Sequence, residues 1–447
     1  MNPNLLSFRS GGTVHSHGKK NSTESSFMAR VFNRDRRLRV FCLGVLAALV
    51  PSPLPADTVT DWNAIMETTV SPANPFFQTR SAAIVQVAVF EAVNAITHDY
   101  EPYIGGIRAS KGSSPDAAAV AAAYRTLATL YPASVANLDA ARASSLAGIP
   151  DGKAKEEGLA IGEAAASAVL QLRADDGSSA VVPYTRAPAP GVWQPTPPAY
   201  AAALLMGWGA VEPFSLAKAR QFRAPPPPAI SSRKFARDYA EVKDVGHVDS
   251  SSRSSHRTNL ARFYAAVSPV PLYNSAARQV SAAQEHSLSE NARTFALLNI
   301  ALCDALISSM EAKYHYASWR PVTAIRAGDT DNNEGTAPDP TWLPLITTPP
   351  FPSYPSNHAT ASGAARAVLE RIYGEEDFSV TLSTAALAGV QLHYTSWEQI
   401  ADDVDDARIY GGIHFRFEQE AGARQGRRVG HSILRHEMRP RHRRHCD

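Results

Sequence analysis

The sequence predicts an all-α protein. Long stretches repeat apolar residues at helical spacing, and the apolar–polar alternation that marks a strand is nearly absent. Hydrophobic residues make up 44% of the 447 residues, enough to bury a sizeable core. The formal net charge of +2 is too balanced for a nucleic-acid-binding protein. We therefore expect one or two helical domains and no nucleic acid among the partners.

The first 56 residues have the composition of a signal peptide and leader. Arginines between 30 and 39 precede an apolar run at 40–50, and small residues and prolines follow. The run is too short to span a bilayer, and no later stretch reaches about 18 uninterrupted apolar residues. We expect cleavage near Asp57 and an exported protein, periplasmic or extracellular, without an integral membrane span. The alternative is an uncleaved amphipathic anchor, and Met28 is an alternative start.

Helical spacing predicts helices, in order, at 80–96, 117–130, 155–172, 258–267, 277–286, 291–319, 359–373, 380–409 and 415–434. The first of these is apolar almost all round, so we expect it to be buried. Prolines dominate residues 181–230, which predicts a long irregular connection. Residues 338–355 are again rich in proline.

The elements divide into an N-terminal helical region with its proline-rich connection at 57–285, a C-terminal bundle at 286–435 and a basic tail at 436–447. Three cysteines are too few for a disulfide framework. Cys42 lies in the leader and Cys446 in the tail. Cys303 lies in an apolar helical pattern, so we expect it in the core.

The first block with chemical potential is KYHYASWRP, which contains Lys313 and Arg320. On one helix, residues seven apart face the same way, and these two would end an otherwise apolar stripe. Buried cations need a partner, no carboxylate lies on that stripe, and an anionic ligand would serve. Pro321 moves Arg320 toward the end of the helix. The alternative is a pair of surface cations with buried stems.

The second block is PPFPSYPSNHAT, in which proline-rich chain gives way to a predicted helix at Ser356. Ser356 is well placed as the N-cap, and the amides at a helix N-terminus offer a site for an oxyanion. His358 would lie in the first turn and could move protons to or from a bound group. The alternative is a capped helix with an exposed histidine.

The third block is RIYGGIHFRFE. Its two glycines allow a turn, so Arg408 would end one helix and His414 would begin the next. Glu418 lies one helical turn after His414, where it could orient the imidazole by a hydrogen bond. The alternative is an ordinary helical hairpin with surface charges.

Together, in this order, the three blocks resemble the signature of the superfamily shared by vanadium-dependent haloperoxidases and type 2 phosphatidic acid phosphatases. That signature is Lys, six residues, Arg-Pro; then Pro-Ser-Gly-His; then Arg, five residues, His, three residues, Asp. The strings WRPVTAIR, PPFPSYPSNHAT and ARIYGGIHF, with ADTVTDWNAI and VFEAVNAI earlier, resemble its exported bacterial haloperoxidase branch. The resemblance covers most of the chain after residue 57. It implies the helical bundle of that superfamily, preceded by an N-terminal helical region.

The resemblance implies a role for each residue of the blocks. It makes His414 the vanadium ligand, or the nucleophile toward phosphate, and His358 the acid–base residue. The groups it assigns to the oxygens of the oxyanion are Lys313, Arg320, Ser356, the backbone amide of Asn357, and Arg408.

Two residues depart from the family pattern. Asn357 replaces Gly, which keeps the backbone amide but adds a side chain beside the anion. Glu418 replaces Asp and lengthens the arm by one methylene. Neither change removes a charge.

The implied activity is vanadate-dependent oxidation of a halide by hydrogen peroxide, with a small organic acceptor for the product. One alternative is an acid phosphatase that cleaves a phosphomonoester through phospho-His414 and needs no vanadate. A third interpretation is a degenerate oxyanion-binding protein, for which Asn357 is the only support. The sequence leaves open whether the chain forms a homodimer.

Overall fold

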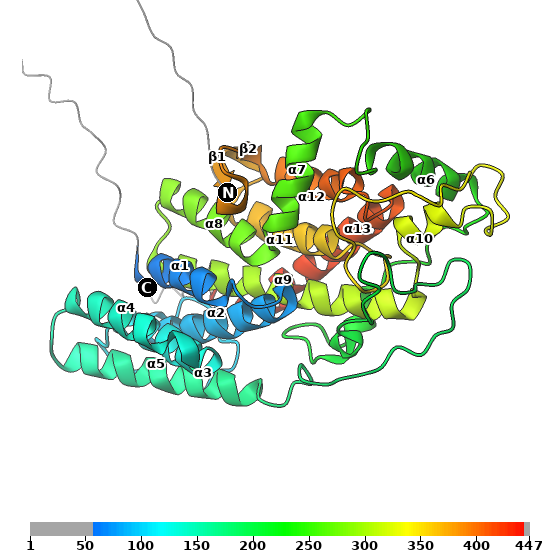
Figure 1. Ribbon diagram of the computed structural model, residues 1–447. Coiled ribbons are helices and arrows are strands. Elements are labelled where there is room, and N and C mark those ends of the chain that lie inside the picture. The colour runs from blue at the N-terminus through cyan, green and yellow to red at the C-terminus, as the bar shows by residue number, and fades with distance from the viewer. Residues whose placement is uncertain (1–56, 442–447) are drawn as a thin grey trace, which may run out of the picture. The chain divides into compact units, whose positions relative to one another are not determined.

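The computed structural model describes residues 57–441 and confirms the helical class, with thirteen α-helices and one pair of strands in that range (Figure 1). The helices are α1 Thr58–Val70, α2 Pro75–Thr97, α3 Pro115–Leu130, α4 Val135–Ala147, α5 Lys153–Leu172, α6 Arg233–Val245, α7 Ser255–Ala266, α8 Pro269–Ala283, α9 Leu288–Tyr316, α10 Pro321–Arg326, α11 Asn357–Tyr373, α12 Trp397–Tyr410 and α13 Arg416–His436. The strands are β1 Glu376–Ser383 and β2 Gln391–Ser396. The predicted signal peptide and leader, and residues 442–447 of the predicted basic tail, lie outside the described residues.

Helix α9 is the central helix of the core. It begins at a capping box between Ser287 and Glu290. Helix α2 packs along it and α11 packs against it as well. Cys303 is fully buried in it, as expected. Within residues 57–441, α9 is the one helix long and apolar enough to cross a membrane, and 94% of its most apolar window is buried inside the protein.

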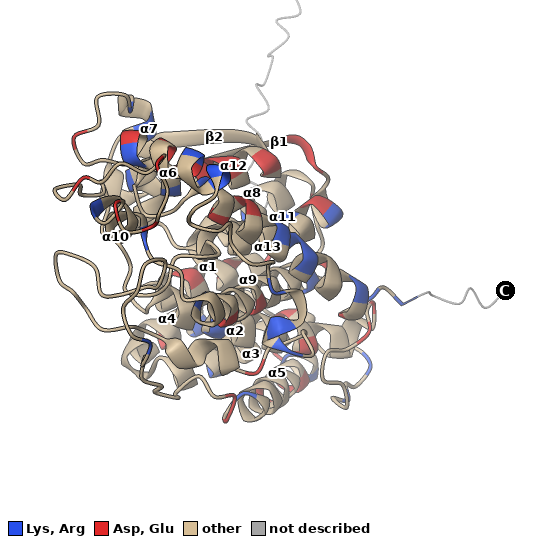
Figure 2. Cartoon of the chain, turned by 90° about the vertical axis from the view of Figure 1, so that its right-hand side faces the viewer, with Lys and Arg blue, Asp and Glu red and all other residues tan. Residues whose placement is uncertain are grey.

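Most helices before and after the proline-rich connection share one hydrophobic core, and α6 and α10 pack in a second, smaller cluster. In Figure 1, α3, α4 and α5 lie together at one edge, and α6 and α10 lie at the opposite edge among long loops. The predicted irregular connection at 181–230 is confirmed, since it contains only short 3-10 turns. The boundary near residue 285 stays a prediction. Acidic and basic residues are interspersed over the side seen in Figure 2.

Four helices were not predicted from the sequence: α1, α4, α6 and α10. Helix α6 carried the clearest overlooked signal. It buries Phe235, Tyr239 and Val242, which follow one another at four- and three-residue steps. That spacing on an otherwise charged segment is typical of an amphipathic helix packed on a core.

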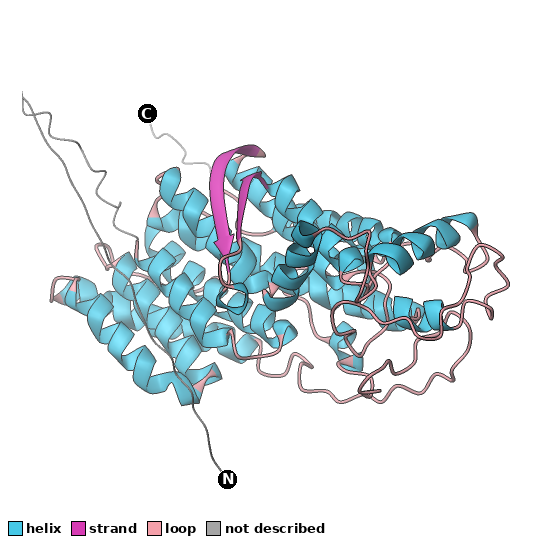
Figure 3. Ribbon diagram, turned by 45° about the horizontal axis from the view of Figure 1, so that its top comes forward, coloured by secondary structure: helices cyan, strands magenta, loops and turns pink. Residues whose placement is uncertain are grey.

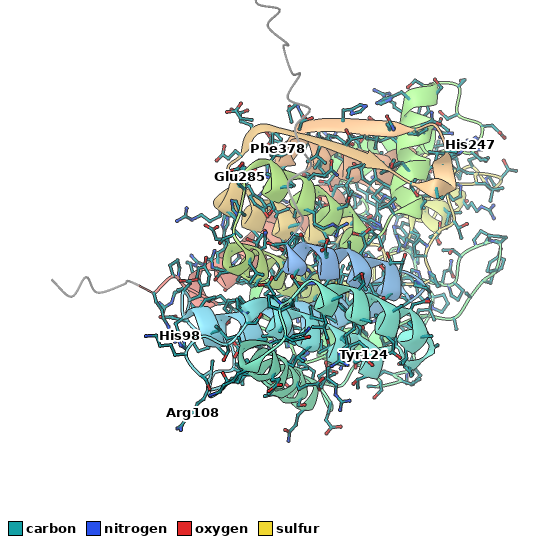
Figure 4. The ribbon with its side chains drawn as sticks, turned by 90° about the vertical axis from the view of Figure 1, so that its left-hand side faces the viewer. His98, Arg108, Tyr124, His247, Glu285 and Phe378 are labelled. Atoms are coloured by element: carbon teal, nitrogen blue, oxygen red, sulfur yellow. The ribbon has the colours of Figure 1, made fainter. Side chains whose placement is uncertain are left out.

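The helix predicted at 380–409 is wrong in its first half, where the chain forms an antiparallel hairpin of β1 and β2 (Figure 3). The physical reason is a short period-two pattern. Phe378, Val380 and Leu382 point into the protein while the residues between them are exposed. Phe378, labelled in Figure 4, packs its ring 4.5 Å from that of Trp397, the residue at which α12 begins.

Glycines on α13 bring that helix very close to α11. A Cβ atom at Gly422 would lie 2.6 Å from the backbone oxygen of Ser356. Gly426 faces the backbone of Thr360 one turn further along. This close approach lets the Ser356 N–H donate a hydrogen bond to the Glu418 backbone oxygen at 3.1 Å. The second and third blocks of the sequence are therefore held side by side.

Candidate functional site

Lys313 lies in the last turn of α9 and is fully buried. Its Nζ donates hydrogen bonds to the backbone oxygens of Pro352, at 3.0 Å, and Ser353. Burial lowers the pKa of Lys313 well below its usual range, and the neighbouring Arg320 charge lowers it further. The first block is thereby attached directly to the proline-rich start of the second.

The prediction that Lys313 and Arg320 share one helix is wrong. Helix α9 ends at Tyr316, because Ala317 takes a left-handed conformation with φ 51°. Arg320 instead precedes α10, where Pro321 occupies the first helical position. The two side chains still converge, since the loop turns Arg320 back toward the end of α9.

Arg320 is fully buried and reaches all three blocks of the sequence. Its Nε donates to the Phe351 oxygen at 2.9 Å, and its Nη1 donates to the Ile413 oxygen at 3.0 Å. Nη1 also lies 3.1 Å from Nε2 of His414. Nη2 is buried and has no hydrogen-bond partner among the described residues. Burial lowers the pKa of Arg320 to about 10, against the opposing effect of Glu418.

Ser356 is the N-cap of α11, as expected, and its Oγ accepts a hydrogen bond from the Ala359 N–H at 3.4 Å. His358 lies in the first turn, with Nε2 3.5 Å from Nη1 of Arg408. Burial lowers the pKa of His358 well below its usual range, and the charge of Arg408 adds to the effect. The neutral imidazole is therefore favoured in the absence of an anion.

Arg408 ends α12 as predicted and is almost fully buried. Its Nη2 lies 3.5 Å from the backbone oxygen of Ala261, and its Nε has no hydrogen-bond partner among the described residues. Burial lowers the pKa of this guanidinium to about 10. Arg408 and Arg320 thus each bring a buried, unpaired N–H donor.

His414 and Glu418 form the expected contact. Nδ1 of His414 lies 2.6 Å from Oε2 of Glu418. The same oxygen accepts from Ser353 Oγ at 2.8 Å and from the Phe415 N–H at 3.0 Å. Because Nδ1 faces a carboxylate oxygen and Nε2 faces an arginine N–H, we assign the histidine proton to Nδ1. Burial raises the pKa of Glu418 to about 7, although Lys313 opposes the shift.

The side chain of Asn357 turns toward α9. Its Oδ1 accepts a hydrogen bond from Ser309 Oγ at 2.6 Å, and its Nδ2 lies 3.6 Å from Sδ of Met310. Asn357 is 6% exposed. The substitution of the family glycine therefore adds a contact between α11 and α9.

The buried charges of this cluster do not balance. Lys313, Arg320 and Arg408 bring three cationic groups, and among the described residues Glu418 is the one carboxylate that hydrogen-bonds to any predicted site residue. Buried charge of one sign requires a counter-charge. Arginine donors suit the oxygens of a tetrahedral oxyanion. The unpaired N–H groups of both arginines therefore fit an oxyanion such as vanadate or phosphate.

A cavity of about 240 Å³ adjoins the two histidines. Its other walls are mostly apolar and include Phe351, Leu306 and Ile413. Three separate parts of the N-terminal region also contribute, at residues 74–76, 204 and 269. The cavity thus offers a small apolar molecule access to His358 and His414.

Sequence reasoning missed Ser353 and Phe351. Ser353 is fully buried and donates to the carboxylate of Glu418. The ring of Phe351 lies 5.5 Å from Lys313 Nζ and 5.1 Å from Arg320 Cζ. Both residues belong to the string PPFPSYPSNHAT, so their place inside the second block was the available signal.

The chain is similar to known vanadium-dependent haloperoxidases. A family model described as the second helical-bundle domain of VCPO matches residues 293–443, which include every predicted site residue. A vanadium chloroperoxidase of Curvularia inaequalis is 34% identical over 124 residues, covering 24% of this chain and 20% of that protein. The chain therefore spans about one fifth of the length of this curated relative.

Two solved structures resemble the whole described chain more broadly. A bacterial vanadium-dependent iodoperoxidase superimposes with a TM-score of 0.74 and 26% identity, covering 88% of this chain and 99% of that one. A bacterial vanadium-dependent chloroperoxidase in its holo form has a TM-score of 0.65 at 16% identity, covering 82% and 93%, which is a likeness of fold. With the three blocks brought together around one buried cationic site, these likenesses support the superfamily of vanadium-dependent haloperoxidases and type 2 phosphatidic acid phosphatases as the relatives of this chain.

Proposed function

We propose that this protein is a vanadate-dependent haloperoxidase that uses hydrogen peroxide to oxidise a halide, with a small organic molecule as acceptor. The observation that carries the proposal is the buried cationic cluster around Nε2 of His414, with unpaired N–H donors on Arg320 and Arg408. Vanadate would supply the Lewis-acidic centre that activates peroxide toward halide.

The position of each site residue would determine its role. Glu418 holds the proton on Nδ1 of His414, so that the Nε2 lone pair is the one offered to vanadium. The three cations Lys313, Arg320 and Arg408 neutralise the oxyanion. At the start of α11, the Ser356 hydroxyl and the Asn357 N–H are hydrogen-bond donors to its oxygens. His358, neutral and beside Arg408, exchanges a proton with the reacting group.

The same donors fit phosphate, so an acid phosphatase acting through phospho-His414 is the competing function. The cavity beside the histidines favours the haloperoxidase, because its walls are mostly apolar and suit a small neutral acceptor better than a charged phosphomonoester. A degenerate oxyanion-binding protein is the remaining alternative.

Paired assays on the purified chain distinguish these functions. The first measures halogenation with iodide or bromide and hydrogen peroxide, with and without orthovanadate, and the second measures hydrolysis of a phosphomonoester without vanadate. We expect vanadate-dependent halogenation in the wild type and none in His414→Ala. Phosphomonoester hydrolysis that vanadate inhibits, without halogenation, would establish the phosphatase instead. Anion binding without either activity would leave the degenerate protein.

Export is a separate proposal that rests on the arginine-rich segment and short apolar run before residue 57. N-terminal sequencing of protein recovered from the periplasm or the medium should give a first residue near Asp57. Recovery of the intact segment 30–50 in cytoplasmic protein would contradict this proposal without affecting the proposed chemistry.

A further inference from the structure

Asn357 departs from the glycine of the family signature at a position that lines the cavity beside both histidines. Its side chain nonetheless contacts Ser309 and Met310 on α9, which are not among the residues that line the cavity. Oδ1 accepts from Ser309 Oγ at 2.6 Å, and Nδ2 lies against Met310 Sδ at 3.6 Å. A glycine would make neither contact.

Ser309 is fully buried on α9, four residues before Lys313, so it lies one turn away on the same face. The Ser309–Asn357 hydrogen bond thus joins the helix that carries Lys313 to the first turn of α11, which carries His358. On its other side, α11 is held by the Ser356 N–H, which donates to the backbone oxygen of Glu418 at 3.1 Å. The first turn of α11 is therefore attached to two different helices.

We propose that Asn357 is a positioning residue that, through Ser309, sets the spacing between Lys313 and the donors at the start of α11, and so sets the affinity of the oxyanion site. This inference rests on the oxyanion site of the proposed function. On this proposal, Asn357 supports the oxyanion site and is no sign that the site has degenerated. The substituted side chain strengthens the attachment of the second block to the first.

The chain offers a closely matched control for this hydrogen bond. Ser308 is the neighbour of Ser309 on α9, is equally buried, and accepts a hydrogen bond from Gln425 Nε2 at 2.8 Å. That bond also joins α9 to another helix, α13, but neither of its residues contacts the first turn of α11 through this bond. Loss of the Ser308 hydroxyl should cost comparable stability without moving the start of α11.

The experiment measures the dissociation constants of orthovanadate and of inorganic phosphate, by calorimetric titration of the full chain, for Asn357→Ala, Ser309→Ala, the double variant and Ser308→Ala. Each single change at the pair should weaken anion binding roughly 3- to 10-fold, the range expected for one hydrogen bond. The double variant should bind the anion with no lower affinity than the single variant that binds it less tightly, because both changes remove the same hydrogen bond. Ser308→Ala should bind as the wild type does, while thermal unfolding reports its loss of stability.

Wild-type affinity in Ser309→Ala, or effects of the two changes that simply add, would overturn this proposal and leave the proposed function standing. Equal weakening in Ser308→Ala and Ser309→Ala would also overturn it, since general loosening of α9 would then be the cause. A wild-type protein that binds neither anion would overturn the proposed function together with this inference.

Discussion

His414 Nδ1 and Glu418 Oε2 lie 2.6 Å apart in the interior of the protein. Ser353 Oγ and the Phe415 N–H donate to the same carboxylate oxygen, so Oε2 is surrounded by donors on three sides. This arrangement fixes the imidazole ring and its tautomer, leaving Nε2 directed at Arg320. The longer arm of glutamate, compared with the family aspartate, is accommodated without loss of the contact.

Replacing the carboxylate of Glu418 tests this relationship. In Glu418→Gln the amide cannot supply the negative charge that favours a proton on Nδ1, so we expect vanadate affinity to fall about 10- to 100-fold. Glu420→Gln is the control, because Glu420 pairs with Lys234 at 3.0 Å and makes no contact with His414. Titration of the two variants with vanadate measures their affinities. Unchanged affinity in Glu418→Gln would show that Glu418 does not affect how His414 binds vanadium.

The two histidines should differ in what they support. His414→Ala should abolish tight vanadate binding, because it removes the only expected covalent ligand. His358→Ala should keep vanadate bound and slow turnover by roughly 10²–10⁴-fold, the usual contribution of a general acid–base residue. Vanadate affinity and bromination rate are measured separately on both variants. If His358→Ala loses vanadate and His414→Ala retains it, the roles are reversed.

The sequence predicted the helical class and which residues converge, because both depend on local patterns that can be recognised in the sequence alone. The spacing of apolar residues identified α2, α9 and α11, and motif chemistry identified the cations around His414. The helical-face argument for Lys313 and Arg320 was wrong, however. A left-handed Ala317 ends the helix, and nothing in the local sequence demands that conformation of an alanine.

Other features of the site depend on tertiary contacts and could not be predicted. The partners of Ser353 and Asn357 lie far away in the sequence, at Glu418 and Ser309. The hairpin of β1 and β2 was overlooked because its few alternating residues directly precede a genuine helix. The apolar walls of the cavity come partly from the N-terminal region, which carries no motif of its own.

The close approach of α13 to α11 predicts a specific effect of Gly422→Ala. The added Cβ would lie 2.6 Å from the Ser356 oxygen, so the start of α11 and α13 must move apart. We expect lower thermal stability together with weaker vanadate binding. Gly158→Ala is the matched control, because it creates a similar clash with the Ser114 oxygen between α5 and α3, far from the site in the sequence. It should lower stability and leave affinity unchanged, and equal losses of affinity in both variants would contradict this view.

Asp304 provides a test of pH dependence away from the oxyanion site. It is fully buried on α9 and accepts hydrogen bonds from the backbone N–H groups of Phe214, Ser215 and Leu216. Burial raises its pKa from 3.8 to about 6, although these hydrogen bonds oppose the shift. A carboxyl whose pKa is higher in the folded state stabilises the fold below its unfolded pKa, and this contribution is lost as the pH rises through 6.

The size of this effect follows from the shift of about two units, which corresponds to roughly 3 kcal/mol. Asp304→Asn does not titrate at this position, so the free energy of unfolding of the wild type should fall relative to this variant by most of that amount between pH 4 and pH 7. Urea denaturation of both proteins at several pH values measures the difference and cancels the other titrating groups they share. A difference that stays constant over this range would mean that Asp304 titrates normally in the folded protein, and that its three backbone hydrogen bonds offset its burial.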